Sequence, residues 1–468
     1  MMRKFVDDRR GAVAVVVGVS AVALMLFVGV AIDSTRAYFV KDVLQKSLDA
    51  AGLAAGSAID SAFLQADAQE FFDANFSGLG GTASLDSFTV VVDPAGEVIN
   101  LNATATMYTT FMALGGIETV TVAASTEITR ETGSMEVVLV MDNTGSMNNS
   151  GKLAAMQAAA TDLVNILFGS ETVHPNLWMG LVPFSSAVNL GARPTWLSGA
   201  GQTIIANDDF HPTAWKGCLM ARNYASGGDM TEVSPLAEGF EPYWYEDTYY
   251  GYNNWIYGSA GMAEWVARDP DCCEVVETLP GGVDGDTGPN NYCGVEVTSM
   301  TPVRQSVVDG IAAMQARGWT QINQGLIWGW RMLSPNWRGL WGGETPATLP
   351  VDYDDPQVSK AIVLLTDGDN TFNGSKTAYG TPADFGGTDT TRVAFLNNRL
   401  STVCTNAKAQ GIQIFAITFG AGISTGTQTL MRNCASVPSY YFDAPTGAQL
   451  TTVFQTIAGE LQSLRISN

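Results

Sequence analysis

An apolar run that ends in a short, oxygen-rich turn is the feature that most constrains the fold of this chain. Residues 137–141 (VVLVM) have the composition of a buried strand, and residues 142–146 (DNTGS) follow them directly. In a tight turn that contains glycine, the alternating Asp142, Thr144 and Ser146 can point one carboxylate and two hydroxyls at one spot. Oxygen ligands of this kind suit a hard divalent cation such as Mg²⁺. The pattern therefore predicts a strand that ends in a cation site.

Two later segments place oxygen-bearing side chains at the ends of predicted elements. Thr320 follows Gly318 just before a predicted helix, and Asp367 comes directly after the strand-like run 362–366 (IVLLT). Because strands and helices alternate here, we expect a parallel, doubly wound sheet, in which ligands bind beyond the carboxyl ends of the strands. The three segments should then meet at one edge. The alternative interpretation is that Asp, Thr and Ser serve here as ordinary turn and capping residues.

The pattern between residues 134 and 468 predicts one α/β domain of mostly parallel, doubly wound type. A helix over 150–168 should end at Gly169, because glycine favours the position after a helix. Further strands are expected at 179–184, 412–417 and 440–442. The closing helix carries apolar residues on one side: Leu450, Val453, Phe454, Ile457, Leu461 and Leu464.

The charge balance argues against a nucleic-acid partner. The 468 residues carry 24 basic and 46 acidic side chains, for a net charge of −22. Binding to phosphates needs a basic face, which such a balance does not favour. The excess of carboxylates fits a solvent-facing body that can hold divalent cations, or simply a surface coated with carboxylates.

An uncharged stretch near the N-terminus predicts a membrane anchor. Residues 12–32 are 21 residues without a charge, long enough to cross a bilayer as a helix. Basic residues precede them within 1–11, so the positive-inside rule leaves that segment in the cytoplasm and sends the rest across: Arg3, Lys4, Arg9 and Arg10. A cleaved signal peptide, with 29–31 (GVA) as its processing site, is the alternative. The helical pattern continues past residue 32, which favours a retained anchor.

Residues 33–130 predict a small region that follows the anchor. Apolar residues three or four apart give the segment 33–56 one buried helical stripe: Ala37, Val40, Leu44, Leu48, Ala51 and Ala55. The runs 88–92 and 98–101 flank the turn-forming sequence 93–96 (DPAG), and 117–128 predicts another strand. A long N-terminal helix followed by antiparallel strands is a pilin-like arrangement.

The cysteines predict an oxidising compartment. All six follow the uncharged stretch, at Cys218, Cys272, Cys273, Cys293, Cys404 and Cys434. An even number on the translocated side indicates disulfides. We expect a bond between Cys404 and Cys434, since the two predicted helices that carry them can be neighbours in a doubly wound sheet.

An insertion at about 189–299 separates the second predicted strand from the helix before Thr320. It holds four of the cysteines and a dense aromatic run between residues 240 and 265. Exposed aromatic side chains would mark a binding surface. The same residues could instead form a small core in a loop-rich insert, and the sequence leaves both interpretations open.

The three ligand loops resemble the metal-ion-dependent adhesion site of von Willebrand factor A domains, in which the first loop reads Asp-x-Ser-x-Ser. Thr144 replaces the first Ser and keeps its hydroxyl. The resemblance implies Mg²⁺, or Mn²⁺ or Ca²⁺, held directly by Thr144, Ser146 and Thr320. It implies that Asp142 and Asp367 hold the ion directly or through water, and that a ligand carboxylate completes the octahedron.

The N-terminal region resembles TadE/TadG-type proteins of the Tad (type IVb, Flp) pilus system. The resemblance rests on 9–14 (RRGAVA), 36–38 (RAY) and 44–55 (LQKSLDAAGLAA), and it is closest to TadG-like members. It implies a bacterial envelope protein that acts with Tad pili. The usual Glu at the fifth position from the cleavage-site glycine is missing, because counting from Gly11 gives Val16. Prepilin-type processing is therefore in doubt.

Two functional interpretations follow. The first is a pilus-associated adhesin that uses the metal to capture an acidic group on a protein or surface ligand. The second is an inner-membrane scaffold for pilus assembly whose metal site holds another pilus component. An enzyme is disfavoured, because the sequence has no Gly-x-Ser-x-Gly elbow, His-Glu-x-x-His pair or Walker loop. We expect a single-pass inner-membrane protein that is mainly periplasmic, or one carried at the cell surface with the pilus.

Overall fold

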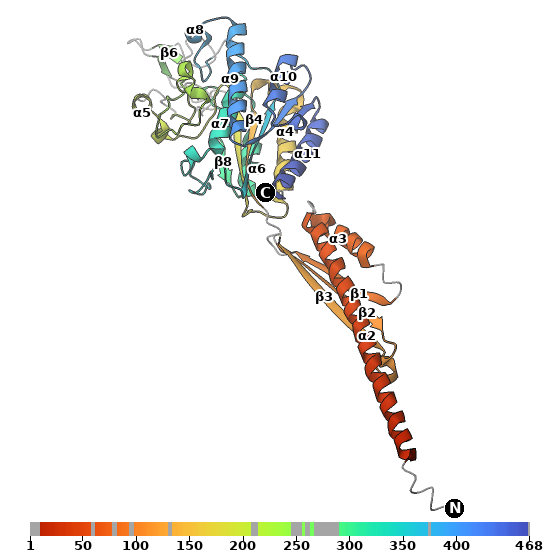
Figure 1. The fold of residues 1–468 in the computed structure, drawn as a ribbon. Coiled ribbons are helices and arrows are strands. Elements are labelled where there is room, and N and C mark those ends of the chain that lie inside the picture. The colour runs from red at the N-terminus through yellow and green to blue at the C-terminus, as the bar shows by residue number, and fades with distance from the viewer. Residues whose placement is uncertain are drawn as a thin grey trace, which may run out of the picture. The chain divides into compact units, whose positions relative to one another are not determined.

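The chain divides into two compact units, Met1–Thr132 and Gly133–Asn468, in a computed structural model. Figure 1 shows the helices and strands of both. The structure describes residues 10–57, 61–76, 82–92, 98–129, 133–206, 214–244, 255–257, 263–265, 290–372 and 376–466. Cys272 and Cys273, and most of the aromatic run after residue 244, lie outside these ranges.

The first unit is built on one long helix, α2 (Arg10–Ser57), as the unbroken pattern predicts. Its C-terminal half packs against α3 (Ser61–Phe76) and a three-stranded antiparallel sheet. The sheet has the order β1-β2-β3, formed by β1 (Ala83–Val92), β2 (Val98–Tyr108) and β3 (Thr119–Thr129). The predicted stripe is buried there at Val40, Leu44, Leu48, Ala51 and Ala55.

The N-terminal half of α2 is different, because its apolar side chains have almost no cover within the unit. Figure 1 shows this half extending beyond the small sheet. Val19, Met25 and Phe27 are among its exposed side chains. Among the described residues, one helix is long and apolar enough to cross a membrane, and it is this one.

The second unit is built on a six-stranded sheet with the order β11-β10-β9-β4-β5-β8. All its strands are parallel except β8, which pairs antiparallel with β5 at the edge. Numbered along the chain from β4, this order is 3-2-1-4-5-6 when read from β8, so the strand order reverses between β4 and β9. The strands are β4 (Ser134–Asp142), β5 (Leu177–Phe184), β8 (Thr298–Thr301), β9 (Val358–Thr366), β10 (Gln413–Phe419) and β11 (Tyr441–Ala444).

Helices cover both faces of this sheet. Successive side chains of a strand point to opposite sides, so each strand contributes to both cores. In β4, Val137 and Leu139 belong to the core under one helical layer, while Val138 and Val140 belong to the core under the other. The first layer is α4 (Lys152–Phe168), α6 (Arg304–Ala313) and α11 (Gly447–Ile466). The second is α7 (Ile322–Leu333), α9 (Asp389–Ala409) and α10 (Thr425–Cys434). The α/β fold expected from the sequence is therefore the one observed.

Two details differ from the sequence expectations. The helix expected from residue 150 begins at Lys152, because Ser150 and Gly151 have left-handed backbone angles (φ 55° and 70°) that end the preceding 3₁₀ turn, Gly145–Gly151. The last residues of the insertion are not loop, since Thr298–Thr301 forms the edge strand β8.

The described part of the insertion favours a small core over an aromatic binding surface. Phe240 and Tyr243 are buried, and Phe240 packs 5.3 Å from Trp328 between ring centroids. A disulfide joins Cys218 to Cys293 across 75 residues. The expected disulfide between Cys404 on α9 and Cys434 at the end of α10 is also present. The structure describes further short elements in α5 (Gly199–Ala206), β6 (Trp255–Tyr257), β7 (Ala263–Trp265) and α8 (Pro382–Phe385).

Candidate metal centre

The two aspartates expected to hold a cation end adjacent parallel strands. β4 and β9 pair with Met141 opposite Leu365, which brings Asp142 next to the end of β9. Asp142 is fully buried, and its Oδ2 accepts a hydrogen bond from Thr366 Oγ1 (2.8 Å) and from the backbone N–H of Asp367 (3.3 Å). The carboxylates therefore lie at the point where the strand order reverses, which is where doubly wound sheets bind their ligands.

The turn after β4 arranges its oxygens in a chain between the two aspartates. Thr144 donates from its backbone N–H (2.9 Å) and its Oγ1 (2.6 Å) to Asp142 Oδ1. The hydroxyls of Thr144 and Ser146 lie 3.0 Å apart, and Ser146 Oγ donates to Asp367 Oδ1 at 2.5 Å. Four of the five predicted ligand residues thus form one hydrogen-bonded chain, in the order Asp142, Thr144, Ser146 and Asp367.

The loop before α7 is fastened to this turn through the backbone. The N–H of Gly145 donates to the carbonyl of Gly318 (3.0 Å), and the N–H of Arg317 donates to that of Asn143 (2.8 Å). Gly318 has a left-handed φ of 73°, and a Cβ added there would lie 2.8 Å from Ser186 Oγ. A glycine therefore suits this position, where the backbone is left-handed and packs closely against Ser186.

Thr320, the fifth predicted ligand, lines the same cavity as Ser146. Its backbone N–H donates to Thr371 Oγ1 (2.9 Å), which fixes the loop against the segment after β9. The cavity has a volume of about 460 Å³ and lies over the carboxyl ends of β4 and β9. Its lining includes Ser146, Tyr292, Trp319, Thr320, Asp369 and Thr371.

The electrostatics of the site favour a cation. Burial and, to a lesser extent, the negative charge of Asp367 together raise the pKa of Asp142 to about 6. Hydrogen bonds from Thr144 and Thr366 act in the opposite direction. Two carboxylates held this close with little water repel each other, and a positive charge between them removes that penalty.

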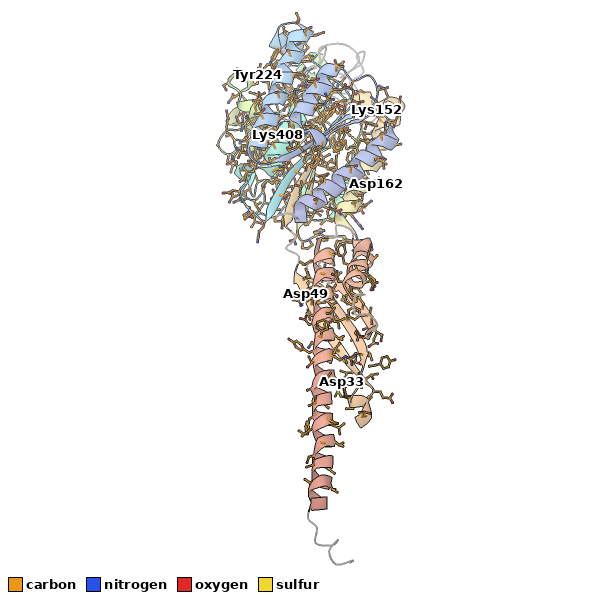
Figure 2. All side chains as sticks on the ribbon, turned by 45° about the vertical axis from the view of Figure 1, so that its right-hand side comes forward. Asp33, Asp49, Lys152, Asp162, Tyr224 and Lys408 are labelled. Atoms are coloured by element: carbon orange, nitrogen blue, oxygen red, sulfur yellow. A yellow bond between two sulfur atoms is a disulfide. The ribbon has the colours of Figure 1, made fainter. Side chains whose placement is uncertain are left out.

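Lys152 already supplies part of this positive charge. This residue was not predicted from the sequence as part of the site. Its Nζ lies 2.8 Å from Asp367 Oδ2, and the Lys152 side chain is 18% exposed. Figure 2 labels it at the start of α4, the helix that follows the first ligand loop. The only sequence signal is a lysine six residues after Ser146, and the ion pair spans 215 residues of chain. A contact between residues so far apart in the chain follows from the pairing of the strands. No local sequence pattern predicts it.

The donor set fits a hard divalent cation better than zinc. Its atoms are carboxylate and hydroxyl oxygens, which suit Mg²⁺ or Mn²⁺, whereas structural zinc sites use Cys and His. Within the described ranges, no group of three or more His, Cys, Asp and Glu side chains gathers in a way that could hold a metal. A cation here would depend on hydroxyls from Thr144, Ser146 and Thr320 beside the two aspartates.

Comparison with known proteins connects the N-terminal segment to pilus assembly. Residues 11–58 match the Tad family model, described as Flp pilus-assembly TadE/G-like. No curated protein matches the chain.

Several solved structures resemble parts of this chain. The von Willebrand factor domain of the type V pili tip protein Mfa5 from Porphyromonas gingivalis is 12% identical, over 70% of this chain and 95% of that one, with a TM-score of 0.37. The pilus adhesin SpaC from Lactobacillus rhamnosus GG is 11% identical, over 81% of this chain and 34% of that one, with a TM-score of 0.34. Proximal thread matrix protein 1 from the mussel byssus, with a zinc-occupied MIDAS motif, is 14% identical, over 70% of this chain and 47% of that one, with a TM-score of 0.31.

This chain spans less than half the length of SpaC and of the byssus protein. The TM-scores are low, so the fold assignment rests on the strand order itself. That order, with an antiparallel edge strand, is doubly wound, and the loops that carry Asp142, Thr320 and Asp367 lie near the point where it reverses. The chain thus joins an N-terminal segment that matches the TadE/G-like pilus-assembly family model to a doubly wound α/β domain.

Proposed function

We propose that this protein is a membrane-anchored component of a Tad pilus system that binds a partner through a divalent cation. The cation is held by Thr144, Ser146 and Thr320, with Asp142 and Asp367 binding it directly or through water. An acidic group on the partner supplies the remaining ligand. The partner is another pilus component or a surface ligand, and the interaction is adhesive and not catalytic.

One observation carries this proposal. Asp142, Thr144, Ser146 and Asp367 form a continuous chain of hydrogen-bonded oxygens at the carboxyl ends of β4 and β9. Ordinary turn residues would need no such convergence between strands more than 200 residues apart. Ser146, within this chain of oxygens, lines the cavity, so an ion bound to Ser146 would have an open face.

The open face explains why the partner should be acidic. The two aspartates together carry two negative charges, and one divalent cation balances them. Hydroxyl ligands are neutral and leave the ion a strong electrophile toward an incoming carboxylate, as hard cations prefer charged oxygen ligands. Asp369 lines the cavity but already accepts hydrogen bonds from the backbone and side chain of Ser424, so it does not close the site from within.

The anchor supports a place in the envelope. The exposed apolar half of α2 includes residues 15–32, and the match to the TadE/G-like family covers the same segment. The Cys218–Cys293 and Cys404–Cys434 disulfides favour an oxidising compartment for the second unit. Together these features favour an inner-membrane protein with its binding domain in the periplasm.

Calorimetric titration of the full chain in nanodiscs with Mg²⁺ and Mn²⁺ tests the site. We expect one binding event for the native protein and none for Asp142→Ala. Asp162→Ala is the matched control, because Asp162 is exposed on α4 and makes the same change in net charge. Figure 2 shows Asp162 and Lys152 at different positions along this helix. Equal affinity in all three proteins would rule the site out.

A second titration tests the partner chemistry. Sheared pili should bind the native protein in Mg²⁺, and the binding should be lost in EDTA and in Asp142→Ala. Binding that persists in EDTA would show that the pilus is recognised through another surface.

A further inference from the structure

The loop between β2 and β3 is apolar and exposed. Residues 109–117 (TTFMALGGI) contain no charged side chain, and Met112–Gly115 forms one 3₁₀ turn at the tip. The tip side chains face away from the small core of the first unit, since Phe111 is 38% exposed, Leu114 78% and Ile117 49%. A soluble surface loop seldom presents three large apolar side chains within seven residues.

This loop is fixed to α2 by one buried carboxylate. Asp33 accepts hydrogen bonds from the backbone N–H groups of Thr110, Phe111 and Met112, at 2.7–3.1 Å. Arg36 donates to Thr110 Oγ1 (2.8 Å) and also pairs with Asp33. Figure 2 labels Asp33 on α2 beside this loop. The position of the loop on the helix is therefore set by Asp33, the first charged residue after the uncharged stretch.

From Asp33 the loop runs back along the uncharged stretch. A Cβ added at Gly29 would lie 2.4 Å from Phe111 Cβ, so the loop packs directly on the helix there. An apolar groove of about 490 Å³ between them is lined by Val22, Met25, Leu26, Ile32, Phe111 and Leu114, among others. At 1.5 Å per residue, Val22 lies roughly 16 Å along the helix from Asp33. The groove and the loop tip thus lie beside the half of α2 that is proposed to cross the membrane.

A segment that enters hydrocarbon needs partners for its backbone polar groups, and most N–H groups of this loop have them. The N–H groups of Thr110, Phe111 and Met112 are bound by Asp33, as described. Four further donors in 109–117 bond to backbone carbonyls of the same unit: the N–H groups of Thr109, Leu114, Gly116 and Ile117. Thr109 Oγ1 donates to the carbonyl of Ile117 as well. Seven of the nine N–H groups in 109–117 therefore have partners within the unit.

We propose that the β2–β3 loop inserts into the acyl region of the bilayer beside the anchor helix, as a second membrane-embedded element. The occupant of the groove is lipid, because the groove is continuous with the exposed apolar half of α2 and has only apolar side chains around it. Polar and aromatic side chains follow Asp33 on α2 and flank the loop, as expected at a membrane border: Arg36, Tyr38, Tyr108 and Glu118. Tyrosine and arginine are enriched at that depth in membrane proteins. This inference rests on the proposed membrane anchor.

Spin labels on the full chain in liposomes test the insertion. A ketone-bearing residue placed at Leu114, or at the neighbouring exposed Ala113 if Leu114 perturbs the loop, takes a label without involving the cysteines. Met25 on the anchor and Leu236 in the second unit are reference positions, since both are exposed, at 72% and 69%. Collision with O₂ and with the water-soluble nickel chelate NiEDDA then reports the depth of each label.

We expect the loop label to resemble Met25, with high O₂ and low NiEDDA accessibility, and Leu236 to show the reverse. If the Met25 label is in lipid but the loop labels are in water, the inference is wrong and the anchor stands. Loop labels shielded from both reagents would mean a protein contact, which also overturns the inference. A Met25 label in water would remove the anchor and the insertion together.

Discussion

At the residue scale, the charged form of Asp142 lowers the free energy of unfolding, and a bound cation should remove this effect. Its folded-state pKa, about 6, lies above the ordinary value of 3.8. Between these values the folded protein binds more protons than the unfolded one, so this group lowers stability as pH rises through that window. In the metal-free protein at pH 7 the penalty is on the order of 2–3 kcal/mol.

Asp142→Asn should therefore stabilise the metal-free protein at pH 7. One hydrogen bond from the Asp367 N–H is lost, so the net gain should be roughly 1–2 kcal/mol. Urea unfolding in EDTA at pH 5 and pH 7 measures it. The native protein should lose stability relative to the variant between these pH values, and it alone should gain stability when Mg²⁺ is added. A variant less stable than the native protein at both pH values would contradict this account of the carboxylate.

Lys152 should compete with the cation. Its ammonium lies 2.8 Å from Asp367 Oδ2, where a divalent ion would meet repulsion or have to displace it. Lys152→Met keeps the length of the side chain and removes the charge. Mn²⁺ affinity should rise roughly three- to tenfold, as the loss of one partly exposed ion pair is worth about 1 kcal/mol.

Calorimetry on the same protein checks this change. Lys41→Met, at an exposed lysine of the first unit, controls for net charge. A drop in affinity for Lys152→Met would mean that the lysine positions Asp367 for the metal instead of competing with it.

At the scale of elements, the pairing of β4 and β9 contains a buried ion pair. Glu136 and Lys360 are directly opposite in the register, almost without exposure, and hydrogen-bonded to each other. Glu136 also accepts from the backbone N–H of Val351 (2.9 Å). Removing one partner leaves an uncompensated buried charge, which costs about 3–5 kcal/mol.

Lys360→Met should thus destabilise the protein strongly, and the double variant Glu136→Gln/Lys360→Met should recover most of the loss. Chemical denaturation of the three proteins measures both effects. A double variant as unstable as the single one would show that the damage comes from packing and not from the orphaned charge.

Local patterns were enough to predict most elements of both units. The continuous apolar runs in β4 and β9 predicted buried strands, and the spacing from Val40 to Ala55 predicted a buried helical face. The structure confirms both. Helix α3 was not predicted, although Ala68, Phe72 and Phe76 recur at helical spacing and are buried. Strand β8 could not be recognised from four residues, because it exists through its pairing with β5.

The site was predictable only in part for a related reason. Asp142, Thr144 and Ser146 are close in sequence, so their convergence follows from one turn. The ion pair from Lys152 to Asp367 and the backbone bonds from Gly145 to Gly318 join loops that are distant in sequence. Such contacts depend on strand order and register, which no local pattern contains.

At the scale of the whole molecule, the anchor predicts where the protein is found. We expect residues 12–32 to remain attached, since α2 continues without a break from Arg10 to Ser57 and offers signal peptidase no extended site. Intact-mass analysis of the mature protein and fractionation of cells into sheared pili and inner membrane check this. A mature protein that lacks residues 1–31 would show that the anchor is removed. A protein that lacks residues 1–11 and is recovered in sheared pili would indicate a minor pilin.

The central claim is that three loops of the second unit hold one divalent cation, and anomalous scattering from crystals grown with Mn²⁺ tests it most directly. The account predicts a single strong peak in the cavity over β4 and β9, roughly 2.0–2.3 Å from the hydroxyls of Ser146 and Thr320, by analogy with hard-cation oxygen distances. It also predicts that the peak is absent in Asp142→Ala. Crystals at saturating Mn²⁺ with no peak there, and with Lys152 still paired to Asp367, would contradict it.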